Sequence, residues 1–259
     1  MSTEQIIYLH DGTFEGMLNA VAVAVKSEKN VEGVYRDTEY TPSLFTALIR
    51  LDTDQNQASR LFQYLLKLHW SATRLAIDGF LSEDGETGTH LYRMVHDSLQ
   101  IGAGILQSYS HDSVRYLDQL SQRVRLEAHR LNGLIRFRVL KNGLLYAPVE
   151  PDFRILGYCA DHFKTRLTSR RWILHDINRN EAMYWDTESL QPIDVDQAFV
   201  EHVRVHKEVP TDNLHNDETH YQELWQAFHS SIANKDRENK ELQRKFMPRR
   251  YWKYLIEQP

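Results

Sequence analysis

Cysteine is almost absent from this chain of 259 residues, which contains only Cys159. A single cysteine excludes an internal disulfide framework, a multi-cysteine zinc site and an iron–sulfur cluster held by cysteines of this chain alone. Disulfides are rare in reducing compartments, so this usage favours a cytoplasmic protein.

Long apolar runs are also missing. The best one, residues 17–25, is interrupted by Asn19 and stops at Lys26, which is too short for a membrane span or a signal peptide. The patterns G-x-x-x-x-G-K-[ST], G-x-G-x-x-G and H-E-x-x-H do not occur. Their absence excludes nucleotide-driven motors and dinucleotide enzymes that use these loops, and we expect neither a metal site nor a cofactor.

Charge of neither sign dominates. The chain has 31 Lys and Arg against 36 Asp and Glu, a net charge of −5 at pH 7, and 41% hydrophobic residues. This composition predicts a globular protein with a buried core. It excludes a histone-like polycation, so nucleic acid would have to bind to a local basic surface.

The first 125 residues begin with an apolar run, residues 6–9, that ends at Asp11-Gly12. This pattern predicts a strand and a turn, after which Thr13 caps a helix that begins near Phe14. Asp11, Gly12 and Thr13 form a candidate anion-binding turn, and the alternative is a tight turn with a helix cap. We expect a second short strand at residues 34–36, and three-to-four spacing predicts helices over residues 43–50, 56–69, 72–80, 90–108 and 113–131.

The hydrophobic period changes to two after Gly133. This change predicts a hairpin that carries Arg136 and Arg138 on one face, a helix, and a second hairpin. The elements of this β-β-α-β-β unit are residues 134–140, 144–149, 155–167, 172–174 and 182–185. We therefore predict an α+β fold, in which residues 126–190 form one antiparallel sheet backed by a helix. The sheet packs with a mainly helical region, residues 1–125, and with a helical C-terminal segment, residues 191–259.

The C-terminal segment is acidic at first and then becomes basic, with aromatic residues between the cations. Single-strand binders combine cations that neutralise phosphates with rings that stack on bases. The candidate nucleic-acid-binding residues are Arg130, Arg136, Arg138, Arg244, Arg249, Arg250, Tyr251 and Trp252. In the alternative interpretation the rings pack onto the body of the protein, and the arginines pair with acids such as Glu127 and Glu150.

Three residues could support acid–base chemistry. His129, His175 and Asp176 lie near the ends of the predicted sheet, where a histidine could act as a general acid or base and Asp176 could orient it. The alternative is that these are structural groups with satisfied hydrogen bonds, because no nucleophile lies beside them in the sequence.

Three stretches resemble a known family. The first, YLHDGTFEG at residues 8–16, is similar to the family's opening Y-D-G-[ST]-F-E-G, with two residues here between tyrosine and aspartate. The second includes EAHR at 127–130, RFR at 136–138, GLLYAP at 143–148 and WILHD at 172–176. The third includes YQELW at 221–225 and PRRYW at 248–252. They resemble a bacterial family of unknown function described as putative DNA repair or DNA metabolism proteins.

The resemblance implies partners rather than a catalytic centre. Relatives look like partners of a radical S-adenosylmethionine protein, and some are fused to a uracil-DNA-glycosylase-like domain. We therefore predict an accessory protein of DNA repair or DNA metabolism that binds single-stranded or damaged DNA for a partner enzyme. Two alternatives stay open: an enzyme that processes nucleic acid with a His/Asp site, and a structural subunit of a radical S-adenosylmethionine protein complex.

Overall fold

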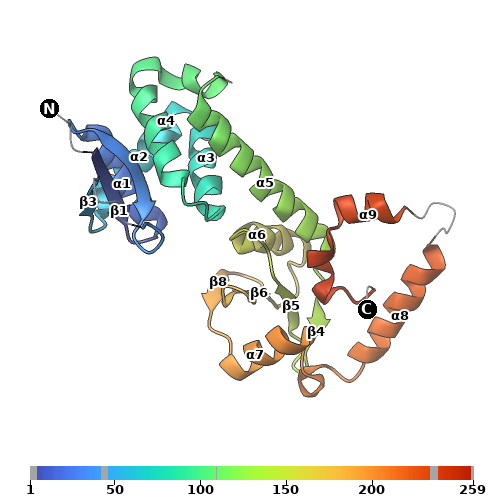
Figure 1. Cartoon of the computed structure of the whole chain (residues 1–259). Helices are drawn as coiled ribbons and strands as arrows, with labels where there is room; N and C mark the ends of the chain where they lie inside the picture. The colour runs from blue at the N-terminus through green and yellow to red at the C-terminus, as the bar shows by residue number, and fades with distance from the viewer. Residues whose placement is uncertain (1–4, 42–45, 109, 234–238, 258–259) are drawn as a thin grey trace. The chain divides into compact units, whose positions relative to one another are not determined.

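The computed structural model describes residues 5–41, 46–108, 110–233 and 239–257. The chain divides into two compact units, Met1–Arg125 and Leu126–Pro259, which are called unit 1 and unit 2 below (Figure 1). Helix α5 (Asp112–Leu134) contributes residues to both units. None of the described helices combines the length and the low polarity needed to cross a bilayer.

Unit 1 opens with the predicted strand, turn and helix. Strand β1 (Gln5–His10) leads to α1 (Phe14–Lys26), and the Thr13 side chain accepts a hydrogen bond from the Gly16 N–H as the helix cap. The chain then forms β2 (Val31–Arg36), which pairs with β1 in parallel. The pairing is parallel because α1 carries the chain back to the end of the sheet from which β1 started.

The prediction of a helix over residues 43–50 is wrong for its described part, Thr46–Arg50, which forms strand β3. Residues 43–45 lie outside the described residues. Strand β3 pairs in parallel with β1 and completes a three-stranded sheet of order β2-β1-β3. The ladder with β1 outweighs the helical spacing of a five-residue segment, because strand formation depends on a neighbouring strand rather than on local propensity.

Helices form the rest of unit 1, as predicted. They are α2 (Gln55–Leu68), α3 (Trp70–Leu81), α4 (Thr87–Ile101) and the first part of α5. The helix predicted over residues 90–108 changes at Gly102, whose φ of 72° ends α4, and a 3₁₀ helix η1 (Gly102–Gln107) follows. The core contains Val21, Leu65, Leu91, Met94 and Leu117, each with at most 1% of its surface exposed.

Unit 2 contains the predicted β-β-α-β-β order and one further strand. Its elements are β4 (Arg138–Val139), β5 (Leu145–Val149), α6 (Leu156–Arg166), β6 (Trp172–Asp176), β7 (Glu181–Trp185) and the additional β8 (Leu190–Ile193). The sheet order is β4-β5-β6-β7-β8. The α+β fold class is confirmed, but the sheet is not wholly antiparallel, because β5 and β6 pair in parallel. Helix α6 crosses over between these two strands, and a crossover connection returns the chain in the same direction.

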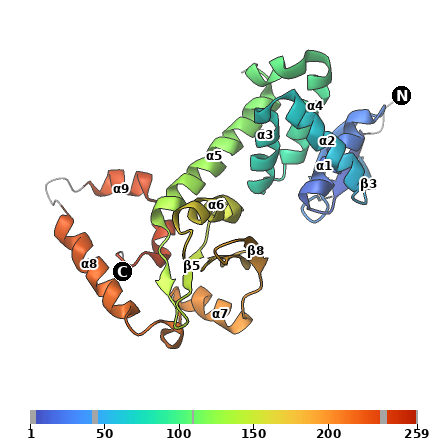
Figure 2. The ribbon, with the colours of Figure 1, turned by 180° about the vertical axis from the view of Figure 1, so that it is seen from behind.

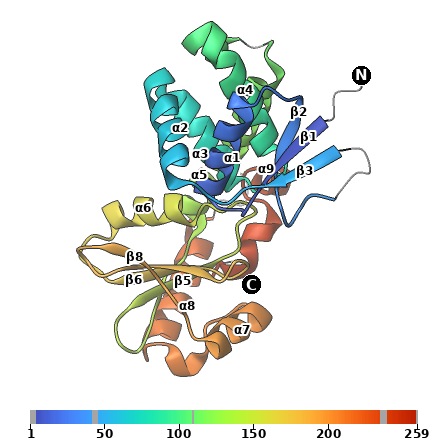
Figure 3. The same ribbon diagram turned by 90° about the vertical axis from the view of Figure 1, so that its left-hand side faces the viewer.

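The two faces of this sheet are covered by different helices, α6 and α7 (Gln197–His206) (Figure 3). On the α6 face, Phe137 lies edge-on to the rings of Phe163 and Trp172. On the α7 face, the Phe199 ring meets Tyr146 at a centroid distance of 5.1 Å. These aromatic contacts fix both helices on the sheet.

The C-terminal part of unit 2 is helical. It contains η2 (Thr211–Asn213), α8 (Glu218–Ile232), α9 (Lys240–Phe246) and the 3₁₀ helix η4 (Arg249–Tyr254). Helix α9 lies beside the C-terminal end of α5 (Figure 2), where Arg130 of α5 donates a hydrogen bond to the Lys245 carbonyl. This contact brings basic residues that are far apart in the sequence into one region.

Candidate nucleic-acid interface

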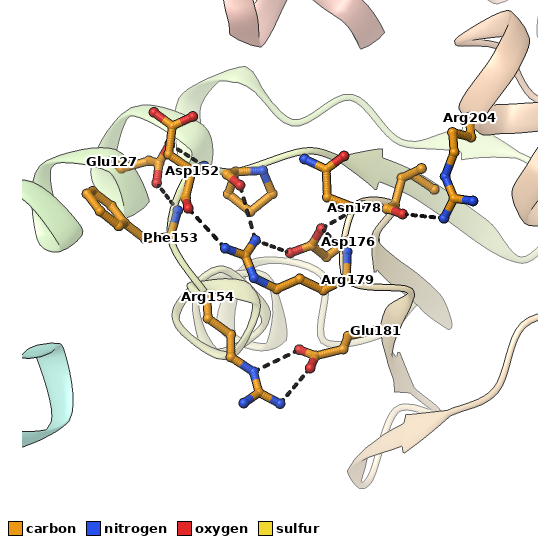
Figure 4. A network of polar contacts seen from close by, with 11 residues as sticks. Glu127, Asp152, Phe153, Arg154, Asp176, Asn178, Arg179, Glu181 and Arg204 are labelled. Atoms are coloured by element: carbon orange, nitrogen blue, oxygen red, sulfur yellow. Dashed lines mark hydrogen bonds and ion pairs between the residues drawn. The ribbon is translucent and has the colours of Figure 1, made fainter. Parts of the chain in front are cut away.

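A buried carboxylate organises the centre of unit 2. Glu127 of α5 is 3% exposed and accepts hydrogen bonds from the backbone N–H groups of Asp152 and Phe153, at 3.0 and 2.9 Å (Figure 4). It also accepts a 2.7 Å bond from the hydroxyl of Tyr251 in η4. Burial, together with the Glu127 charge, raises the pKa of Tyr251. Glu127 therefore joins α5, the loop before α6 and the C-terminal segment.

Asp176, a predicted catalytic residue, lies in the same network and is fully buried. Its carboxylate accepts hydrogen bonds from the N–H groups of Asn178 and Arg179 and pairs with the Arg179 guanidinium at 2.9 Å. Arg179 also donates to the carbonyls of Pro151 and Asp152. Burial raises the pKa of Asp176, an effect that the Arg179 contacts oppose. Through these bonds Asp176 and Arg179 hold the β6–β7 turn to the loop before α6.

The two predicted catalytic histidines have different environments. His175 is fully buried, with Nδ1 2.8 Å from the Tyr146 hydroxyl and Nε2 3.4 Å from Asn180 Oδ1, and burial lowers its pKa. His129 is exposed on α5. A cavity of about 590 Å³ between the sheet and α7 is lined by Tyr146, among others, but by none of the predicted site residues. The contacts of His175 favour the structural interpretation.

Arg136 and Arg138 do not form the predicted pair on one strand face. Helix α5 continues to Leu134 and β4 begins only at Arg138, so Arg136 lies between the two elements. Arg136 pairs with Glu257 and its guanidinium lies 5.5 Å from the centre of the Trp225 ring. Arg138 is 6% exposed and donates to the Tyr254 carbonyl, and burial lowers its pKa. Both guanidinium groups are therefore occupied within the protein.

The end of the basic tail is similarly occupied. Arg250 pairs with Asp152 at 2.9 Å and lies over the ring of Tyr251, which is 6% exposed and cannot stack on a base. Lys253 pairs with Glu150, which also binds Lys207 and the hydroxyl of Tyr254. Although burial acts against ionisation, these three hydrogen bonds lower the pKa of Glu150 to about 2.

Four cations on neighbouring segments of unit 2 have no carboxylate partner among the described residues. Arg130, Arg244, Lys245 and Arg249 come from α5, α9 and η4, and none of them is ion-paired with a carboxylate in the described part of the chain. The Arg130–Lys245 hydrogen bond joins α5 to α9, and the Arg249 guanidinium lies 5.9 Å from the centre of the Trp252 ring. We call these four residues the α5–α9 cationic surface. Half-buried Trp252 donates from Nε1 to the Met247 carbonyl, which fixes the ring at the edge of this surface.

The candidate anion-binding turn lies in unit 1, and its backbone donors are bound by the side chains of His10 and Asp11. Asp11 Oδ1 accepts from the N–H and the hydroxyl of Thr13, and Oδ2 accepts from Thr53. The Gly12 N–H donates to His10 Nδ1. Although burial acts the other way, the bonds from Thr13 and Thr53 lower the pKa of Asp11. An ionised carboxylate thus occupies the turn, which favours the interpretation as a tight turn with a helix cap.

Glu127 and Glu150 have roles that the sequence did not reveal. Both were expected as possible ion-pair partners of the arginines, whereas Glu127 binds backbone N–H groups and Glu150 binds two lysines. A signal for Glu127 was present, since it lies beside Ala128 on the apolar face of α5. A carboxylate at such a position requires buried partners.

The comparison with known families finds a match, which begins inside unit 1 and crosses the boundary between the two units. The model of DUF4130, a domain of unknown function, matches residues 85–257. The chain belongs to this family. The match includes all of unit 2, with the α5–α9 cationic surface, except its last two residues, and it excludes the Asp11–Thr13 turn. No curated protein matches the sequence. Among the described residues, no three His, Cys, Asp or Glu side chains are grouped so that they could hold a metal ion.

Proposed function

We propose that this protein binds single-stranded or damaged DNA through the α5–α9 cationic surface and presents it to a partner enzyme. The observation that carries the proposal is the arrangement of Arg130, Arg244, Lys245 and Arg249, which come from three elements and have no described carboxylate partner. Cations that are free of carboxylates can neutralise phosphates at little cost, whereas Arg136 and Arg250 would first have to leave Glu257 and Asp152.

The ring of Trp252 supports a single-stranded rather than a double-stranded ligand. Its Nε1 is bound to the Met247 carbonyl and Arg249 lies against the ring, so phosphate binding and base stacking would occur side by side. A base that stacks on an aromatic ring contributes about 1–3 kcal/mol, and only unpaired bases expose their faces. The proposed ligand is therefore a strand with accessible bases.

The resemblance suggests the partner. A radical S-adenosylmethionine protein, in some relatives together with a uracil-DNA-glycosylase-like domain, would act on the strand that this chain holds. The chain's own role in the proposal is binding and orientation, because the buried contacts of His175 and Asp176 leave these two groups no route to a substrate.

The test is fluorescence anisotropy with a labelled 20-nucleotide single strand. Four phosphate contacts give a slope of about −2.8 for log affinity against log salt, so affinity should fall about 50-fold between 50 and 200 mM salt. A variant in which Arg130, Arg244, Lys245 and Arg249 are all changed to Gln should lose most of this dependence. The matched control changes four other exposed cations to Gln and alters the net charge equally, namely Lys141, Arg166, Arg170 and Arg171.

Two results would contradict the proposal. If the control variant and the surface variant weaken binding equally, the DNA is attracted to positive charge in general rather than to one site. Absence of binding at 50 mM salt, with retention of the radical S-adenosylmethionine protein in co-purification, would instead favour the structural subunit. Circular dichroism of both variants checks that they are folded.

A further inference from the structure

Helix α8 carries an apolar stripe that the described part of unit 2 leaves largely exposed. Tyr221, Leu224, Phe228 and Ile232 are each more than half exposed, at 58, 51, 54 and 62%. At 3.6 residues per turn, the four side chains lie within about 80° of the helix circumference. Large apolar side chains that are scattered on a surface are normal, but a continuous stripe along about three turns indicates a binding surface.

The contacts of α8 explain why the stripe is not buried in unit 2. Glu218 accepts a hydrogen bond from the Val139 N–H, Trp225 Nε1 donates to Glu257, and Gln226 donates to the Ile256 carbonyl. These three residues occupy the sector of the helix next to the stripe. They hold one side of α8 on unit 2 and leave the adjacent stripe exposed, and the helix lies at the rim of the unit (Figure 1).

From this geometry we infer that α8 is a dimerisation helix, which packs its stripe against the same stripe of a second copy of the chain. The inference does not depend on the proposed function. Most soluble oligomers are two-fold dimers in which one surface meets itself, and a straight apolar stripe is self-complementary in this way.

The area of the stripe agrees with a stable dimer. The exposed fractions of Tyr221, Leu224, Phe228 and Ile232 equal about 2.25 complete side chains. At about 200 Å² for each side chain, this is about 450 Å² of apolar surface. Apolar atoms form about 65% of a homodimer interface, so the interface would cover about 700 Å² on each copy. This is the usual size for a specific complex.

The charges of α8 favour an antiparallel pair. The acidic residues of the α8 region, Asp217, Glu218 and Glu223, all lie in its N-terminal half, whereas residues 224–232 contain no Asp, Glu, Lys or Arg. In an antiparallel pair each acidic end meets the uncharged half of the other copy, and the helix dipoles oppose one another favourably. A parallel pair would place the acidic ends together.

The experiment measures molar mass by light scattering after size exclusion, at 50 and 200 µM full-length chain. We expect twice the chain mass of 30.5 kDa for the wild type and the monomer mass for the Leu224→Asp/Phe228→Asp variant. The matched control is Leu99→Asp/Ile101→Asp in unit 1, which replaces side chains that are 58 and 60% exposed and should leave the dimer intact.

Circular dichroism and the urea midpoint, measured on both variants, separate loss of pairing from loss of folding. If the stripe variant is unfolded, Leu224→Ser/Phe228→Ser replaces it as the test pair. A wild-type chain that is monomeric at 200 µM overturns the inference and leaves a different protein as the occupant of the stripe. A dimer that the folded stripe variants retain, or that the control abolishes, overturns it as well.

Discussion

Replacing Glu127 with Ala should destabilise unit 2 more than the same substitution of an exposed glutamate. The substitution removes the acceptor of three hydrogen bonds at once, from the N–H groups of Asp152 and Phe153 and from the Tyr251 hydroxyl. The two N–H groups are only partly buried and water can reach them, whereas the hydroxyl is buried and would lose its charged acceptor.

The magnitude follows from these environments. A hydrogen bond to a charged group contributes about 1.5–3 kcal/mol, and less where water can replace it. Counting about 1 kcal/mol for each N–H and about 2 kcal/mol for the hydroxyl, Glu127→Ala should lower the free energy of unfolding by about 4 kcal/mol. Tyr251→Phe removes the hydroxyl, which donates to Glu127 and accepts from Arg250, and should cost about 1.5 kcal/mol.

The double variant isolates the contact between these two side chains. In the Glu127→Ala background the Tyr251 hydroxyl no longer has its carboxylate, so Tyr251→Phe should cost nearly nothing there. The expected coupling energy is therefore about 1.5 kcal/mol. The control is Glu241→Ala on α9, an exposed glutamate, which should change the free energy of unfolding by less than about 0.5 kcal/mol.

The assay is urea unfolding of the full chain followed by tryptophan fluorescence. Four of the five tryptophans, Trp172, Trp185, Trp225 and Trp252, belong to unit 2, so the signal reports mainly on that unit. The reasoning is refuted if Glu127→Ala costs less than about 1 kcal/mol, or if the effects of the two substitutions simply add.

Two further predictions concern pH. Glu150 has its pKa lowered to about 2 in the folded protein, so its contacts stabilise fully above the unfolded value near 4.5 and are lost as pH falls toward 2. At pH 6 the free energy of unfolding of the wild type should exceed that of Glu150→Gln by up to about 3 kcal/mol, and this difference should disappear by pH 2. A difference that stays constant as the pH falls would contradict the role of Glu150. Buried His10 has its pKa lowered to about 4, first by burial and then by Arg36, so protonation of the unfolded chain destabilises unit 1 as pH falls from 6.5 toward 4. His10→Gln should flatten the pH dependence of far-ultraviolet circular dichroism melts in that range, and an unchanged slope would contradict the assignment.

Local patterns predicted most of the helices and many of the strands. The strand–turn–helix opening with Thr13 as cap depends on neighbouring residues, and so do the period-two segments that form β5, β6 and β7. The strand predicted over residues 134–140 forms only at Arg138–Val139. The errors occur where a distant partner decides the structure. Residues 46–50 are a strand because β1 lies beside them, and β5 and β6 are parallel because α6 returns the chain.

The residue types of the candidate site were also visible in the sequence, but the sequence did not show which of the cations are paired with carboxylates. Composition and spacing identified Arg130, Arg249 and Arg250 as equivalent basic residues. The fold separates them. Arg250 pairs with Asp152, from a loop about a hundred residues earlier, whereas Arg249 lies against the ring of Trp252 and has no carboxylate partner among the described residues. Whether a cation is neutralised depends on which carboxylate lies within about 4 Å of it.

The order of residues by itself determined that this chain forms helices and strands around apolar cores, because the periods of 3.6 and 2 and the turn residues act over short distances. The tertiary structure alone decided which charges are paired, which rings are buried and which face of α8 stays uncovered. Those outcomes depend on contacts between segments that can be more than a hundred positions apart in the sequence. Such contacts stabilise the protein only after the backbone has brought the segments together.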